Sequence, residues 1–227
     1  MPKRGTVIAI DGPVASGKTV VGKKLAEQLG YTFVDTGAIY RAVTLAVLRS
    51  DVSLDAEDAI VGVAEGSSID ITSPTIQDGR LYTVLLDGQD ATWAVRSPEV
   101  EAHVSQVSRI PGVRRALLGK QRALAARGRI VMVGRDVGTV VLPDADLKIF
   151  LVASPQVRAR RRYEELRARG QNASQEGILQ NLLERDRIDS QRIVAPLKPA
   201  EDAILVDTDH LSIDEVVAAI LRELDGE

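Results

Sequence analysis

The segment Gly12–Thr19 constrains the fold of this chain more than any other. It reads Gly-Pro-Val-Ala-Ser-Gly-Lys-Thr and matches the pattern G-x-x-x-x-G-K-[ST] at every fixed position. The apolar run Val7–Ile10 precedes it, and a helical pattern that begins at Lys18 follows it. A strand, a glycine-rich turn and a helix in this order place backbone N–H groups around a phosphate. The segment therefore predicts a phosphate-binding loop, rather than an ordinary strand-to-helix turn with a lysine facing the solvent.

The loop predicts a site for a nucleoside triphosphate bound with Mg²⁺. We expect Lys18 to reach the β- and γ-phosphates and the Thr19 hydroxyl to ligate the metal ion. The chain has no N-K-x-D stretch of the kind that reads guanine, so a GTPase switch is not favoured. The residues expected to contact the triphosphate are Gly12, Pro13, Val14, Ala15, Ser16, Gly17, Lys18, Thr19 and Val20.

Strand and helix patterns alternate along most of the chain, which predicts an α/β fold with a parallel sheet wrapped by helices. Short apolar runs predict five buried strands, at residues 7–10, 32–35, 130–133, 148–152 and 203–206. Amphipathic patterns predict helices over residues 18–29, 38–49, 97–127 with a break at Pro111, and 212–224.

The pattern changes between residues 66 and 94. Two strand-like stretches, 68–72 and 80–86, are joined by turn signals, and Asp87-Gly88 is a further turn signal. This predicts a small antiparallel insert. We predict one domain over residues 1–227: a core of 1–65, 95–153 and 193–227, the β insert 66–94, and a helical segment 154–192.

Arginine dominates the basic residues, with 22 of 29, while the formal net charge is −3. A guanidinium grips planar oxyanions with two parallel hydrogen bonds, so this excess suggests an anionic ligand. The net charge argues against a general nucleic-acid or anionic-membrane binder. The chain has no cysteine, which excludes disulfides and is typical of the cytoplasm. No apolar run approaches the ~20 residues needed to cross a bilayer.

Polar residues follow two of the predicted strands. Thr36 and Arg41 come after the strand at 32–35, and Arg135 and Asp136 come after the strand at 130–133. Ligands of open parallel sheets bind beyond the carboxyl ends of the strands, so these side chains can meet a second ligand. For Arg41 a plain charge on a helix surface is an equal alternative, and Asp136 also suits a strand-end turn.

Two arginine-bearing helical stretches lie between residues 154 and 192. The first is either a solvated charged helix or a mobile cover that brings positive charge onto the phosphates; its candidates are Arg158, Arg161 and Arg162. In the second, Arg185, Asp189 and Arg192 share one helix face at i, i+4 and i+7. That face either forms a stripe of ion pairs or presents the Asp189 carboxylate, between the two arginines, to sugar hydroxyls.

Four blocks of sequence together resemble the bacterial cytidylate kinase family: Asp11–Thr19, Asp35–Arg41, Gly134–Pro143, and Arg185–Arg192 followed by Ala195-Pro-Leu. They occur in the family's order and span essentially the whole chain. The resemblance implies the P-loop kinase fold, with the β insert as the region that binds the nucleoside monophosphate and an arginine-rich helical lid. It also implies transfer of a phosphoryl group from ATP, with Mg²⁺, to CMP or dCMP, in a cytoplasmic monomer without a stable nucleic-acid or membrane partner.

The resemblance further implies a role for individual residues. Ser105, Arg114 and Asp136 match positions that contact the cytosine ring, and Arg185, Asp189 and Arg192 match positions around the ribose and its phosphate. Arg41 and Arg135 match phosphate-binding positions, and Thr36 and Tyr40 belong to the same pocket. The residues expected to act in catalysis are Lys18, Arg41, Arg135 and Arg192, and those expected to reach ATP from the lid are Arg158, Arg161 and Arg162.

The chemistry of the base agrees with this assignment. Cytosine presents an N4–H₂ donor, to which the Asp136 carboxylate can accept, whereas uracil presents an O4 acceptor there. Arg114 only donates, which suits the O2 and N3 acceptors of cytosine. Two alternatives stay open: a P-loop kinase for another small acceptor such as UMP, and an ATP-gated module whose arginine helices bind RNA. The net charge and the 3% aromatic content weigh against the RNA-binding module.

Overall fold

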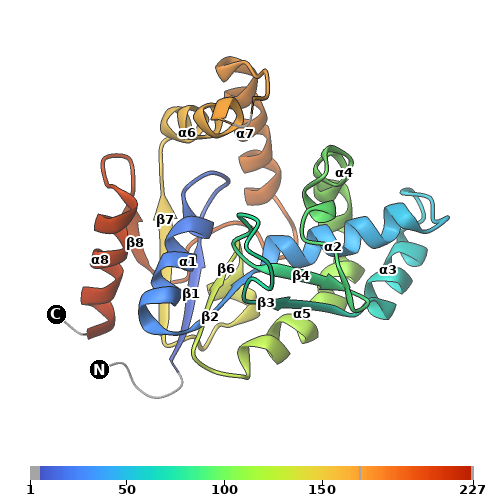
Figure 1. Cartoon of the computed structure of the whole chain (residues 1–227), viewed down its shortest axis with the longest axis horizontal. Helices are drawn as coiled ribbons and strands as arrows, with labels where there is room; N and C mark the ends of the chain where they lie inside the picture. Colours follow the sequence, from blue (N-terminus) through green and yellow to red (C-terminus); the bar gives the residue numbers. More distant parts are fainter. Residues whose placement is uncertain (1–5, 169, 226–227) are drawn as a thin grey trace.

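The computed structural model describes residues 6–168 and 170–225, and a five-stranded parallel sheet forms its centre (Figure 1). The strand order is β2-β6-β1-β7-β8, with every neighbouring pair parallel. Burial explains the apolar runs, since all of β6 and nearly all of β1 are inaccessible to solvent. The strands are β1 (Val7–Asp11), β2 (Thr32–Asp35), β6 (Ile130–Val133), β7 (Leu147–Val152) and β8 (Ile204–Asp207).

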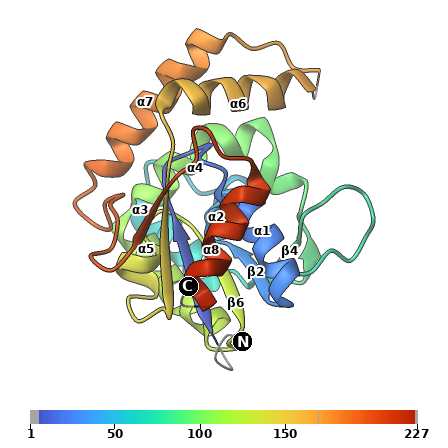
Figure 2. The same cartoon turned by 90° about the vertical axis from the view of Figure 1, so that its left-hand side faces the viewer.

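Helices cover both faces of this sheet, as Figure 2 shows, with α1 and α8 on one side and α5 on the other. The predicted fold class is confirmed, and the predicted helix positions agree with α1 (Lys18–Leu29), α2 (Thr36–Arg49), α4 (Pro98–Arg109), α5 (Pro111–Ala125) and α8 (Ile213–Asp225). Helix α2 begins earlier than residue 38 because the Asp35 carboxylate caps it and accepts from the Gly37 N–H at 2.9 Å. The ends of the predicted core, residues 1–5 and 226–227, lie outside the described residues.

The predicted β insert is a three-stranded antiparallel sheet of β3 (Ile69–Thr72), β4 (Thr83–Leu86) and β5 (Gln89–Asp90). Asp87 and Gly88 turn the chain between β4 and β5, with φ angles of 51° and 78°, as the tight hairpin requires. Strand β4 begins after residue 80 because Arg80 is held in the preceding loop by ion pairs with Asp78 and Asp90. The insert shares the main core, which contains Ile71, Val84 and Leu86.

Besides strand β5, three short elements were not expected from the sequence. Helix α3 (Glu57–Gly66) buries only Ile60 and Ala64, so its apolar stripe is too sparse to stand out. A 3₁₀ turn, η1 (Ala94–Arg96), and a π-helical turn, η2 (Val137–Val141), follow β5 and β6 respectively. Tertiary packing decides these elements, because local propensity is weak over such short stretches.

An arm of two helices rises above the carboxyl edge of the main sheet (Figures 1 and 2). It consists of α6 (Pro155–Ala168) and α7 (Gln175–Ser190), which pack against each other. Two of their four buried residues are charged, Arg158 and Asp189. Polar contacts attach both residues to the body, since Asp189 pairs with Arg135 and Arg158 donates to the Val14 carbonyl. No helix within the described part of the chain is long and apolar enough to cross a membrane.

Candidate active site at the carboxyl edge of the sheet

The glycine-rich loop between β1 and α1 has the backbone that its sequence predicts. Gly12 and Gly17 have φ angles of 148° and 95°, and Ala15 also has a positive φ of 61°. A Cβ atom on Gly12 would lie 2.4 Å from the Leu151 carbonyl oxygen of β7, so only glycine fits this approach. The loop is thus packed closely against β7, one of the inner strands of the central sheet.

Lys18 lies over this loop. Its Nζ donates to the Pro13 carbonyl at 2.6 Å and to Ser16 Oγ at 3.4 Å. Burial and the nearby Arg135 charge lower the pKa of Lys18 to about 7, although Asp35, Asp11 and Asp189 oppose them. Burial therefore disfavours the ammonium form of Lys18, and the negative charge of a bound polyphosphate would stabilise it.

The Thr19 hydroxyl and the Asp35 carboxylate lie side by side at the end of β2. Thr19 Oγ1 donates to Asp35 Oδ2 at 3.3 Å, and the Tyr82 hydroxyl donates to the same oxygen at 3.2 Å. Among residues 6–168 and 170–225, no cluster of three or more His, Asp or Glu side chains could hold a metal alone. Mg²⁺ takes one or two protein oxygens and completes its shell with phosphate and water, so Thr19 and Asp35 fit that ion.

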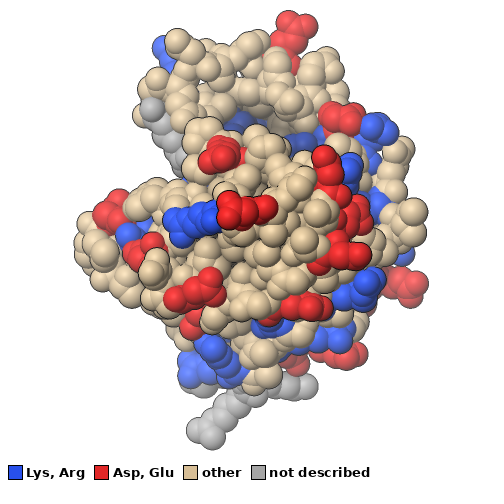
Figure 3. Space-filling model, turned by 90° about the vertical axis from the view of Figure 1, so that its right-hand side faces the viewer, with Lys and Arg blue, Asp and Glu red and all other residues tan. Residues whose placement is uncertain are grey.

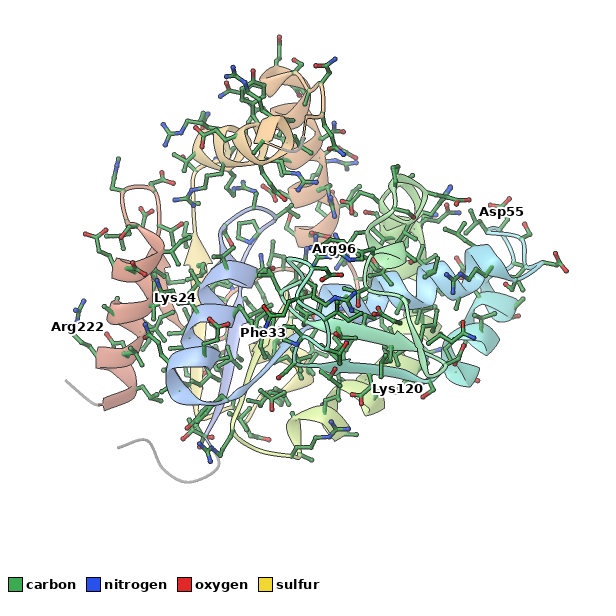
Figure 4. All side chains as sticks on the ribbon, viewed as in Figure 1. Lys24, Phe33, Asp55, Arg96, Lys120 and Arg222 are labelled. Carbon is green, nitrogen blue, oxygen red and sulfur yellow. The ribbon has the colours of Figure 1, made fainter. Side chains whose placement is uncertain are left out.

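The β insert reaches this position through an aromatic stack. The Arg96 guanidinium lies over the Tyr82 ring at 5.3 Å and near the Trp93 ring at 6.0 Å. Figure 4 labels Arg96 near the centre of the molecule, below the arm. Because Tyr82 also donates to Asp35, this stack links the insert to the end of β2.

Asp11 joins the loop strand to the segment that follows β6. Its buried carboxylate accepts from the N–H groups of Val137 at 2.9 Å and Gly138 at 2.7 Å. Burial raises the pKa of Asp11 to about 6 despite these two hydrogen bonds, and the Asp136 charge adds to the rise. The contact positions Asp136 and Arg135 relative to the phosphate loop.

The predicted base-reading pair is in direct contact. Arg114 Nη2 donates to Asp136 Oδ2 at 2.5 Å, with both side chains buried. Arg114 also donates to the Ser108 carbonyl at 3.2 Å and lies 5.2 Å above the Tyr40 ring. Ser105 is half-buried on α4, one turn before Ser108. The structure therefore brings Tyr40, Arg114 and Asp136 together, with Ser105 on the adjoining helix.

Asp189 of α7 binds two predicted phosphate-site arginines. Its Oδ2 lies 2.5 Å from Arg135 Nε, and its Oδ1 accepts from Arg192. Burial and the charges of Arg185 and Arg192 lower the pKa of Arg135 to about 10, although the charge of Asp189 acts to raise it. The predicted helix face of Arg185, Asp189 and Arg192 is wrong, because α7 ends at Ser190 and Arg192 lies beyond it. Arg185 pairs with another carboxylate.

That carboxylate is Glu101 of α4. It accepts from Arg185 Nη1 at 3.1 Å and from Arg41 Nη2 at 3.1 Å. Burial acts to raise the pKa of Glu101, but the charges of Arg41 and Arg185 outweigh it and lower that pKa to about 2. Arg41 is thus held by Glu101 rather than extending freely into solvent, and Arg41, Glu101 and Arg185 form one group of charges.

Of the three predicted lid arginines, one reaches the phosphate loop directly. Arg158 donates to the Val14 carbonyl at 3.1 Å and pairs with Asp186 of α7 at 2.5 Å. Arg161 donates to Thr208, whose hydroxyl in turn donates to the Ser16 carbonyl at 3.5 Å. Arg162 pairs instead with Glu165 on its own helix at 2.8 Å. Figure 3 shows basic side chains at the floor of the hollow beneath the arm, while both signs are interspersed over the rest of that face.

Comparison with known proteins identifies the family of this chain. The family model described as cytidylate kinase matches residues 8–225. The chain belongs to the cytidylate kinase family. The cytidylate kinase of Chloroflexus aggregans is 51% identical over 215 residues, covering 95% of this chain and 92% of that protein. The cytidylate kinase of Caldanaerobacter subterraneus subsp. tengcongensis is 50% identical over 217 residues, covering 96% and 93%.

A solved structure extends the likeness to the fold alone. An uncharacterized protein from Eubacterium ventriosum superposes with a TM-score of 0.53 at 13% identity, covering 99% of this chain and 100% of that one. The resemblance drawn from the four sequence blocks is confirmed at the level of the family, and the chain is an enzyme of that family.

Cytidylate kinase family membership does not by itself explain every residue gathered here. Asp35, Glu101 and Asp186 each contact a predicted site residue, and Asp11 holds the segment that follows Asp136; none of the four was singled out from the sequence. Asp35 had a detectable signal, because it ends a strand and directly precedes Thr36. Asp11 had the same signal, because it ends β1 and directly precedes Gly12. Glu101 and Asp186 are recognisable only by the distant residues they contact.

Proposed function

We propose that the protein transfers the γ-phosphoryl group of Mg-ATP to CMP and dCMP. The single observation that carries this proposal is the buried pair of Arg114 and Asp136. The Asp136 carboxylate offers an acceptor for the N4–H₂ group of cytosine, and Arg114 offers donors to its O2 and N3. UMP would set its O4 acceptor against the carboxylate, and an unpaired buried polar group costs about 1–3 kcal/mol.

The reaction is an in-line displacement between two bound nucleotides. An oxygen of the CMP phosphate attacks the γ-phosphorus of ATP, the bond from that phosphorus to the β–γ bridging oxygen breaks, and ADP leaves. No general base is required because the attacking phosphate oxygen is already anionic. Catalysis then rests on alignment and on charge stabilisation by Lys18, Arg41, Arg135 and Arg192.

Mg²⁺ bound with ATP would neutralise charge on the phosphoryl oxygens. The Thr19 hydroxyl and the neighbouring Asp35 carboxylate would hold it. Lys18, which lies over the loop, would place its ammonium on the β- and γ-phosphates.

Helix α6 of the arm acts as a lid over the triphosphate. Arg158 already contacts the loop at the Val14 carbonyl. Arg161 is connected to the loop through Thr208, which donates to the Ser16 carbonyl. A small movement of α6 would bring both onto ATP, with Arg162 as a third candidate. Exclusion of water by the lid would favour transfer to CMP over hydrolysis. We propose the lid and its following helix as residues 154–192, and the β insert 66–94 as the part that receives CMP.

The cellular setting follows from the same proposal. The protein would act as a monomer in the cytoplasm, with ATP and CMP or dCMP as its partners and no stable nucleic-acid or membrane partner.

A turnover assay tests the proposed function. ADP production with Mg-ATP is followed with CMP, dCMP, UMP and AMP as acceptors, each at the same concentration. CMP and dCMP are expected to be the best acceptors. Comparable rates with UMP or AMP would refute cytosine recognition, and no turnover with any acceptor would favour an ATP-gated binding module.

A further inference from the structure

Glu101 joins two arginines that come from opposite sides of the site. Arg41 lies on α2 in the body, Arg185 lies on α7 next to the lid, and Glu101 lies on α4 between them. Each guanidinium donates to a different carboxylate oxygen: Arg41 to Oε2 and Arg185 to Oε1, both at 3.1 Å. One carboxylate therefore links α2 in the body to α7 in the arm and holds both arginines.

Glu101 and a bound phosphate would compete for the same edge of the Arg41 guanidinium. Arg41 directs its Nε and Nη2 atoms to Glu101 Oε2, at 3.4 Å and 3.1 Å. This is one of the edges with which a guanidinium grips a carboxylate or a phosphate through two hydrogen bonds. A phosphate that takes this edge must displace Glu101 from it.

Exposure distinguishes Glu101 from the other carboxylate in the group. The Asp189 side chain is 5% exposed and is enclosed between Arg135 and Arg192, so it is a fixed part of the site. The Glu101 side chain is 36% exposed, and its partners Arg41 and Arg185 are 27% and 26% exposed. Glu101 can therefore swing into solvent when another anion arrives, whereas Asp189 cannot.

We propose that Glu101 is a placeholder for the phosphate of the acceptor nucleotide. This inference rests on the proposed function and on the positions that the family resemblance implies: Arg41 at a phosphate, and Arg185 around the ribose and its phosphate. Without CMP, the carboxylate neutralises the two arginines. When CMP binds, its phosphate carries more charge than one carboxylate and takes over both guanidiniums. Glu101 thereby lowers the affinity for CMP and sets the KM for the acceptor.

The substitution Glu101→Gln isolates this effect, because it keeps the size of the side chain and removes its charge. We expect CMP to bind about tenfold more tightly to the variant, since a tenfold change corresponds to the loss of one modest competing ion pair. Cytidine, which has no phosphate, should bind equally to both proteins. The KM for CMP should fall while the KM for ATP stays constant.

Glu99→Gln is the matched control. Glu99 also lies in the first turn of α4, so both substitutions remove the same favourable charge from the helix N-terminus. Glu99 is exposed, so its removal should leave the affinity for CMP unchanged. A second variant, Glu101→Asp, keeps the charge but shortens its reach and should give a smaller gain than Glu101→Gln.

Calorimetric titration of CMP and cytidine into the full-length wild type and the three variants tests the proposal. Tighter binding of CMP alone by Glu101→Gln supports it. Unchanged or weaker binding of CMP by Glu101→Gln overturns it, as does an equal gain for cytidine. Wild-type turnover with CMP reports separately on the proposed function. If the wild type phosphorylates CMP while the ratio of affinities is unchanged, only the placeholder is refuted, whereas a wild type that neither binds nor phosphorylates CMP refutes both.

Discussion

Arg114 donates a 2.5 Å hydrogen bond to Asp136 across 22 residues of sequence, and both side chains are enclosed by the protein. In the proposed function, the pair holds its remaining donors and acceptors in place before the cytosine ring binds. Such preorganisation reduces the entropy cost of binding and supports discrimination between similar bases.

Asp136→Asn is expected to lower kcat/KM for CMP and to narrow the ratio of CMP to UMP turnover by about one to two decades. The amide can offer a donor where only the acceptor stood, so it accommodates the O4 atom of uracil. The ratio of kcat/KM values, measured on one preparation, does not depend on the fraction of folded enzyme. A ratio equal to that of the wild type would show that Asp136 does not read the base.

Lys18→Met is expected to reduce turnover by at least about 10²-fold, because it removes a cation from the transferring phosphoryl group. Lys24→Met is a suitable control on the same helix. Lys24 pairs with Asp214 of α8, away from the loop (Figure 4). Steady-state rates and far-UV circular dichroism of both variants check the prediction. Near-normal turnover in Lys18→Met would contradict the assignment of the phosphate loop.

The affinity for nucleotide is expected to fall as the pH rises above about 7. The pKa of Lys18 in the ligand-free protein is about 7, so the side chain loses its charge above that pH, and binding of a polyphosphate must then restore the proton. The limit of this effect is about tenfold in Kd per pH unit. Titration of ADP into wild type and Lys18→Met between about pH 6 and 9 measures it. An equally steep dependence in both proteins would assign it to another group.

Two glycine-to-alanine substitutions are expected to change stability in opposite directions. A Cβ on Gly22 of α1 would lie 2.5 Å from Val133 Cγ1 and 3.0 Å from the Phe33 ring, so Gly22→Ala should destabilise the fold by about 1–3 kcal/mol. Gly62 of α3 is exposed, and no atom lies within 4 Å of the position that a methyl group would take there, so Gly62→Ala should stabilise the fold by up to about 1 kcal/mol. Denaturant unfolding measures both free energies. Equal effects would show that packing on α1 does not require glycine.

Much of the fold was predictable because its signals are local. The five strands are short apolar runs, and the phosphate loop is one contiguous block. The turn at Asp87-Gly88 is recognisable from its residue types. Helix α3 was missed because its two buried residues, Ile60 and Ala64, leave little periodicity. The predicted start of α2 was two residues late, because the Asp35 side chain caps the helix and a pattern of apolar residues cannot reveal a cap.

The amino-acid sequence alone determined the parallel sheet, the phosphate loop, the β insert and the membership of the family, since each depends on residue types at short, regular spacing. Only the tertiary structure decided which carboxylate holds which arginine. Glu101 meets Arg41 across 60 residues and Arg185 across 84, and Arg158 meets Asp186 across 28. Ion pairs at such separations follow no periodicity, because the path of the whole chain brings the partners together.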